Sequence, residues 1–180
     1  MKSGQMADAI AQLEAANSLS PYNTERLVML GDAFFQTGDN AKAKSYYAQA
    51  MNLDSHAKDA QMGMGQVMVS EGDLNGALEL LRNSASEDEA VAFFNNAAVL
   101  AVQKKKIGES FRLYESALKA LKTDRLKPQV YFNLALAFKR LDKIEDALKA
   151  CRRALKYAPD FDKAQRLGQW LEEIAAKRSA

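Results

Sequence analysis

The 180-residue sequence contains one cysteine, one histidine and three prolines. The single cysteine, Cys151, excludes an internal disulfide framework and is typical of a reducing compartment. One histidine, His56, and no Cys/His/Asp/Glu cluster with metal-ligand spacing argue against a metal site. A glycine-rich phosphate loop and a nucleophile motif are also absent from the sequence. These absences predict a non-catalytic protein that has no cofactor and no metal.

Long apolar runs are also absent. No run approaches the ~20 residues that a helix needs to span a bilayer. The start, MKSGQMADAI, lacks the apolar core of about 7–15 residues that marks a secretory signal. The contents of 48% hydrophobic and 27% charged residues are ordinary for a folded soluble protein. We therefore expect a cytoplasmic protein with no membrane insertion.

Charge is distributed unevenly along the chain. Residues 1–90 hold 6 Lys/Arg and 13 Asp/Glu, whereas residues 91–180 hold 19 and 10. The net charge of +2 therefore conceals an acidic first half and a basic second half.

Small residues recur at a shared, slightly irregular interval. One series has intervals of 34, 34, 33 and 37 residues: Ala9, Ala43, Ala77, Ser110 and Ala147. Two further series, which begin at Ala16 and Gly31, follow the same intervals. Large residues recur between them as predicted fillers: Phe34, Tyr47, Leu81, Tyr114 and Phe138. The pattern predicts an internal repeat of about 34 residues.

Each repeat is predicted to contain two helices. Apolar residues at helical spacing are interrupted by breaks such as TGDN and EGDLNG, and no strand-like alternation competes. Asp39 or Asn40, and Asp73, are the predicted N-caps after these breaks.

These features resemble the tetratricopeptide-repeat (TPR) family. The segments that carry the resemblance are LVMLGDAFFQTGDNAKAKSYYAQAMNL and VYFNLALAFKRLDKIEDALKACRRALKYAPD, with Pro21 and Pro159 at repeat ends. The resemblance implies a right-handed α-solenoid of helix-turn-helix repeats, whose first helices line a concave groove. Lys105 and Asp142 fall where turn glycines are expected, and LKTDRLKPQ carries a three-residue insertion, interpreted as a longer second helix or loop.

We predict a single TPR domain over residues 1–180. It is divided into a half repeat at 1–23, repeats at 24–57, 58–90, 91–127 and 128–161, and a closing helix at 162–178. The half repeat matches only a second helix, so its apolar stripe, which is Ala9, Ile10, Leu13 and Ala16, lacks a partner helix. We expect the chain to be a fragment of a longer protein. The alternative is that a second copy or another protein covers this stripe.

A second resemblance concerns the segment FFNNAAVLAVQKKKIGESFRLYESALKAL. It looks like the helical output halves that are attached to receiver domains in some bacterial signalling proteins. This resemblance implies a signalling context.

Asparagines recur on the predicted first helices. Asn133 follows Asn96 by 37 residues, in the same repeat register. TPR proteins similarly use such asparagines to hydrogen-bond the backbone of a bound peptide. We expect Asn96 and Asn133 to bind a ligand backbone, beside Asn95 and Phe132. The alternative is that these amides bond neighbouring helices or water.

Basic residues continue the predicted groove. Lys139 and Arg140 end one first helix, and Lys163 and Arg166 lie one turn apart on the next. An acidic segment or a terminal carboxylate would be stabilised there. Of the carboxylate clamp that chaperone-binding TPR domains use, only Asn133 and Lys163 match, so a chaperone tail is not expected. Nucleic acid is disfavoured because the first half is acidic and stacking aromatics are absent.

Two functions remain open. The first is a protein-protein interaction scaffold that binds a peptide or partner domain in its groove, as part of a larger signalling protein. The second is a self-assembly module that forms homo-oligomers through repeat edges and oppositely charged ends.

Overall fold

The computed structural model describes residues 3–179, which form ten α-helices and no strand. They divide into two compact units, Met1–Ser86 and Glu87–Ala180. Unit 1 contains α1 (Ser3–Leu19), α2 (Thr24–Thr37), α3 (Asn40–Leu53), α4 (Lys58–Glu71) and α5 (Leu74–Ser84). Unit 2 contains α6 (Glu87–Gln103), α7 (Ile107–Ala120), α8 (Lys127–Arg140), α9 (Ile144–Tyr157) and α10 (Asp162–Ser179). The predicted all-α fold is confirmed.

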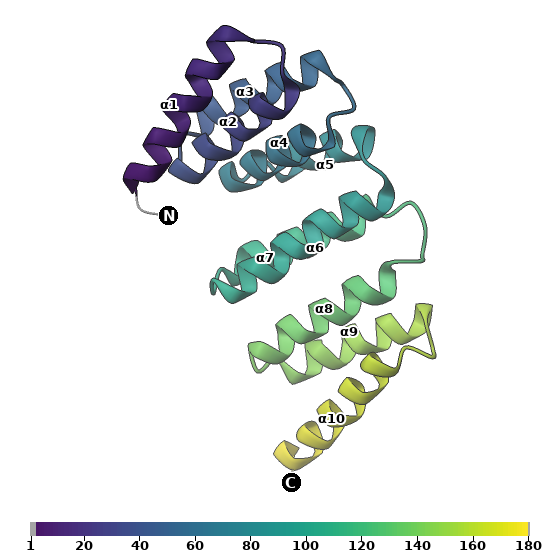
Figure 1. Cartoon of the computed structure of the whole chain (residues 1–180). Coiled ribbons are helices and arrows are strands. Elements are labelled where there is room, and N and C mark those ends of the chain that lie inside the picture. The colour runs from purple at the N-terminus through teal and green to yellow at the C-terminus, as the bar shows by residue number, and fades with distance from the viewer. Residues whose placement is uncertain (1–2, 180) are drawn as a thin grey trace. The chain divides into compact units, whose positions relative to one another are not determined.

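Successive helices pair as antiparallel hairpins, which are α2–α3, α4–α5, α6–α7 and α8–α9 (Figure 1). In unit 1, α1 packs on α2, and in unit 2, α10 packs on α9. This is the helix-turn-helix stacking of an α-solenoid. The repeat boundaries stay a prediction. The helix α6 begins at Glu87, ahead of the boundary predicted at residue 91.

The turns inside the hairpins have the predicted register. Gly38 and Gly72 end α2 and α4 with φ values of 84° and 85°. Lys105 and Asp142 hold the corresponding turns of unit 2 with φ of 60° each. Residues with a side chain rarely adopt positive φ, so Lys105 and Asp142 hold a backbone conformation that glycine adopts at a lower energetic cost.

Two of the turns are closed by side-chain caps. Asp39 accepts a hydrogen bond from the N–H of Lys42 at 3.0 Å, and Asp73 accepts one from Gly76 at 2.9 Å. Asp39 therefore caps α3 and Asp73 caps α5, which confirms both predicted N-caps.

Close helix packing in unit 1 centres on Tyr47, which is fully buried. A Cβ atom added to Gly31 would lie 2.5 Å from the Tyr47 ring, and one added to Gly63 would lie 2.4 Å from it. The ring therefore fills space that only glycine leaves free on α2 and α4. The Tyr47 hydroxyl donates to Asp32 Oδ1 at 2.6 Å, and burial is the main cause that raises the pKa of Tyr47.

The apolar stripe predicted on the first helix is partly packed. Ile10 and Leu13 lie against the unit 1 core, whereas Ala9 is exposed. The carbonyl oxygen of Ala16 accepts a hydrogen bond from Arg26 Nη1 at 2.8 Å. These contacts attach α1 to α2 along one side.

The predicted insertion lies in the loop of residues 121–126 rather than in a longer helix, because α7 keeps the 14-residue length of α9. Glu87, at the start of α6, holds this loop. Its Oε1 accepts hydrogen bonds from the backbone N–H groups of Lys122 at 3.1 Å and Thr123 at 2.9 Å, and from the Thr123 hydroxyl at 2.9 Å. Arg125 pairs with Asp88 beside them.

Replacing Lys105 with glycine should stabilise the protein. A side chain at positive φ costs about 1–2 kcal/mol, and glycine regains part of that while losing more chain entropy on folding. We expect the free energy of unfolding in urea to rise by about 0.5–1 kcal/mol. Gly38→Ala is the matched control and should lower it. An unchanged or lower value for Lys105→Gly would contradict the strain.

The Glu87 contacts predict a pH-dependent loop. Hydrogen bonding, chiefly from the Thr123 N–H, holds the pKa of Glu87 below its ordinary value of 4.5. The contacts are therefore present at neutral pH and are lost as the pH falls through that lowered pKa. The amide proton of Thr123, followed by NMR, should titrate with a midpoint below 4.5. Glu87→Gln should remove this titration, and a midpoint at or above the ordinary value would refute the prediction.

Candidate functional site

All eight predicted site residues lie in unit 2, on α6, α8 and α10. Asn95 and Asn96 are on α6, Phe132, Asn133, Lys139 and Arg140 are on α8, and Lys163 and Arg166 are on α10. Their role in binding stays a prediction, but the structure gives the surroundings of each.

The asparagines have different surroundings. Asn133 Nδ2 donates to Asn95 Oδ1 at 2.9 Å, which joins α8 to α6. Gln129 Nε2 donates to the Asn133 oxygen at 3.2 Å, one turn away on the same helix. Asn95 and Asn133 thus show the interhelical bonding that the sequence left open as the alternative. Asn96 is exposed, and its side chain forms no hydrogen bond within residues 3–179.

Phe132 and Lys139 contact aromatic rings near α10. The Phe132 ring lies 5.2 Å from that of Phe161, measured between centroids. Lys139 Nζ lies 4.0 Å from the centroid of the Trp170 ring, a cation–π contact. Phe132 is partly buried by its packing, whereas Lys139 stays exposed.

The four basic residues form two pairs. The α8 pair, Lys139 and Arg140, ends its helix, and the α10 pair, Lys163 and Arg166, lies at the start of its helix. Figure 1 shows α8 and α10 running in the same direction, so the pairs lie near opposite ends of these helices. Arg166 Nε donates to Asp162 at 2.9 Å. Arg140 has no acidic partner in the part of the chain that the structure describes.

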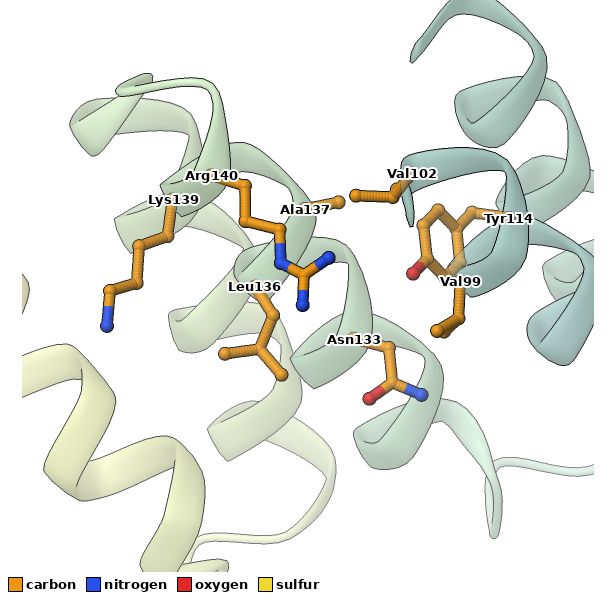
Figure 2. Close-up of a pocket in the computed structure, with 8 residues that line it drawn as sticks. All are labelled: Val99, Val102, Tyr114, Asn133, Leu136, Ala137, Lys139 and Arg140. Atoms are coloured by element: carbon orange, nitrogen blue, oxygen red, sulfur yellow. The ribbon is translucent and has the colours of Figure 1, made fainter. Parts of the chain in front are cut away.

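A pocket of about 340 Å³ opens between α6, α7 and α8 (Figure 2). It is lined by Val99, Val102, Tyr114, Asn133, Leu136, Ala137, Lys139 and Arg140. Three of the predicted residues therefore meet here: Asn133, Lys139 and Arg140. The apolar side chains form walls, and the polar groups come from α7 and α8. In Figure 2 the Arg140 side chain extends away from that of Lys139.

Sequence reasoning missed Tyr114 as a site residue, because it treated the ring as a filler. The residue is only 2% exposed, so that interpretation is correct for the ring. Its hydroxyl, however, forms no hydrogen bond with the described residues and, since it is not among their fully buried polar atoms, opens onto the pocket. Burial raises the pKa of Tyr114 to about 12, and the charge of Arg140 opposes that rise. A comparison of the repeats could have identified Tyr114. Asp32 lies beside Tyr47, whereas the residue at the equivalent place for Tyr114 is Val99.

Unit 1 carries a pocket of different chemistry. It has a volume of about 720 Å³ and lies beside α2 and α4. Its lining includes four acidic side chains and two methionines, which are Glu25, Asp32, Asp54, Asp59, Met29 and Met62. The pockets of the two units therefore have opposite charge character.

The described residues give little support to a reactive thiol or a metal site elsewhere in the chain. Cys151 is buried, and desolvation raises the pKa of its thiol to about 11. Within residues 3–179, no three His, Cys, Asp or Glu side chains are grouped so that they could hold a metal ion. None of the described helices combines the length and apolar character that a bilayer span requires.

Curated proteins with similar sequences are much longer than this chain. DnaJ homolog subfamily C member 7 homolog of Schizosaccharomyces pombe is 25% identical over 174 residues, which cover 90% of this chain and 32% of that protein. BBSome complex member BBS4 of Bos taurus is 27% identical over 161 residues, which cover 87% of this chain and 30% of that protein. The chain spans about a third of these relatives or less.

Solved structures show the same fold. MamA superposes with a TM-score of 0.54 at 17% identity, over 86% of this chain and 89% of that chain. YrrB, a TPR protein with an unusual peptide-binding site, superposes with a TM-score of 0.50 at 15% identity, over 92% and 84%.

Family models described as tetratricopeptide repeat match residues 34–92 and 128–161. Together these segments cover just over half of the chain, and they include the hairpins α4–α5 and α8–α9. The chain belongs to the tetratricopeptide-repeat family.

Proposed function

We propose that the chain is a non-catalytic binding module that holds a peptide, or a segment of a partner protein, on unit 2 between α6 and α8. The observation that carries this proposal is the pocket of about 340 Å³, which combines apolar walls with the Arg140 guanidinium. TPR proteins mediate protein–protein interactions in general, and YrrB, a TPR protein with an unusual peptide-binding site, has the same fold.

The pocket and its rim suit a peptide with mixed chemistry. Val99, Val102 and Leu136 offer an apolar surface to a side chain. Asn96 does not line the pocket, but it lies three residues before Val99 on α6, and its exposed amide has both a donor and an acceptor free for a peptide backbone. Arg140, without an acidic partner of its own, favours an acidic ligand.

The proposal includes a cytoplasmic signalling context within a larger protein. The segment that resembles output halves of bacterial signalling proteins, residues 93–121, covers most of α6 and all of α7. It contributes Val99, Val102 and Tyr114 to the pocket. A partner bound there would contact the segment that carries this resemblance.

Self-assembly is the second candidate, and the opposite charge of the two pockets favours it. The acidic pocket of one copy facing the basic pocket of another would give a heterologous contact. Sedimentation velocity over a hundredfold range of protein concentration separates the candidates. A binding module keeps one sedimentation coefficient, whereas a self-assembly module sediments faster as concentration rises.

Asn96→Ala should weaken peptide binding without destabilising the fold. Peptides selected from a displayed random library against the full chain supply the ligand. Loss of one hydrogen bond to the exposed amide should reduce their affinity about fivefold, while the melting temperature stays unchanged.

Two variants serve as controls for this prediction. Asn133→Ala should lower the melting temperature, because it removes the bond to Asn95. Asn83→Ala, an exposed asparagine on α5 in unit 1, should leave both affinity and stability unchanged. Failure to select any peptide, or an affinity that Asn96→Ala does not change, would contradict the proposed groove.

Association of the selected peptides should slow as ionic strength rises, because exposed charges steer encounter. Reversing the α8 pair to glutamate should remove most of this salt dependence, and reversing the α10 pair should remove less, because Arg166 already pairs with Asp162. Stopped-flow association rates at several salt concentrations measure the effect. The control reverses Lys149 and Arg152 on α9. Equal salt slopes for all variants would show that the basic surface only aids solubility.

A further inference from the structure

Two buried tyrosines occupy equivalent places in the two units. Tyr114 follows Tyr47 by two repeat intervals, and both rings are almost completely buried on the second helix of a hairpin. In unit 1 the Tyr47 hydroxyl donates to the Asp32 carboxylate at 2.6 Å. Asp32 belongs to α2, the first helix of the same hairpin. Unit 1 therefore supplies its own carboxylate to the tyrosine.

Unit 2 lacks that internal acceptor. The residue equivalent to Asp32 is Val99, which has no polar atom in its side chain and lines the pocket. The Tyr114 side chain is 2% exposed, and its hydroxyl has no hydrogen-bond partner among the described residues. The hydroxyl is not among the fully buried polar atoms of the described residues but opens onto the pocket, so it can donate a hydrogen bond to a ligand there.

A cation faces the same space. Figure 2 shows the Tyr114 hydroxyl pointing toward the Arg140 guanidinium, with Val99 below the ring. Arg140 is exposed and has no ion pair among the described residues. A neutral donor and a cation thus converge on a space with apolar walls. An amide oxygen would satisfy the hydroxyl but would leave the Arg140 charge unpaired, whereas a carboxylate satisfies both.

We propose that Tyr114 and Arg140 form a subsite for an aspartate or glutamate side chain of the bound partner, which takes the place that Asp32 occupies in unit 1. This inference rests on the proposed function and specifies its ligand. A side chain is favoured over a chain terminus because the carboxylate beside Tyr47 is itself a side chain. The partner carboxylate accepts from the Tyr114 hydroxyl and pairs with the Arg140 guanidinium.

The experiment uses the full chain labelled with ¹³C at tyrosine Cζ and ¹⁵N at arginine Nε, followed by NMR. Three small probes are titrated: N-acetylaspartate N-methylamide, its neutral asparagine counterpart, and N-acetylalanine as a terminal carboxylate. We expect the aspartate probe to shift the Tyr114 and Arg140 signals saturably. The asparagine probe and N-acetylalanine should bind about tenfold more weakly or not at all.

Variants test each group separately. Tyr114→Phe, followed at Arg140, and Arg140→Gln, followed at Tyr114, should each weaken the aspartate probe about tenfold. Val99→Asp gives unit 2 the kind of internal acceptor that Asp32 provides in unit 1. The Tyr114 signal should therefore shift in the absence of any probe and should no longer respond when the aspartate probe is added. Tyr131→Phe and Arg152→Gln, which change residues outside the pocket, should leave the titration unchanged.

The outcomes separate this inference from the proposed function. Equal responses to the aspartate and asparagine probes, or an unchanged titration in Tyr114→Phe, would overturn the subsite. A response to N-acetylalanine alone would overturn the side-chain assignment. If the selected peptides bind wild type and Tyr114→Phe equally, the groove stands and the subsite falls. If the aspartate probe binds as expected but no peptide is selected, the subsite stands and the proposed function falls.

Discussion

Close approach of helices at small residues is the constraint on which the rest of this structure depends. In unit 1 the Tyr47 ring rests against Gly31 and Gly63, where any Cβ atom would lie within 2.5 Å of it. In unit 2, Ala98 and Ala135 continue the repeat series of Gly31 and Gly65 and are completely buried. Since these positions fix how near the first helices come to their neighbours, they also fix which side chains can meet across them.

Within that fixed register, single substitutions give the two units different surfaces. Asp32 accepts a hydrogen bond from the tyrosine of unit 1, whereas Val99 offers no acceptor, so the Tyr114 hydroxyl has no partner within residues 3–179. Gly63 has no side chain and lies against the Tyr47 ring. Asn133, at the equivalent position of unit 2, has a side-chain amide that donates a hydrogen bond to Asn95. The packing scheme is shared, but the polar groups at its edge are not. The candidate site of unit 2 therefore lies where the sequence departs from the repeat.

The sequence predicted features that follow from spacing. It indicated the helical hairpins, the N-caps Asp39 and Asp73, and the turn positions of Lys105 and Asp142, since each depends on local backbone chemistry. It did not identify the partner of Asn133. Adjacent helix positions point about 100° apart, so Asn95 can face α8 while Asn96 faces solvent, and only tertiary packing decides which does so.

The same geometry separates charges that look continuous in the sequence. Lys139 and Arg140 are neighbours, yet one extends over Trp170 while the other points into the pocket beside Tyr114. A run of basic residues therefore does not make one uniform basic surface. Arg140 is exposed, but its guanidinium faces the Tyr114 hydroxyl and the apolar walls of the pocket. In the binding role that we propose, Arg140 and the side chains around it would set specificity more than the net charge of the basic half does.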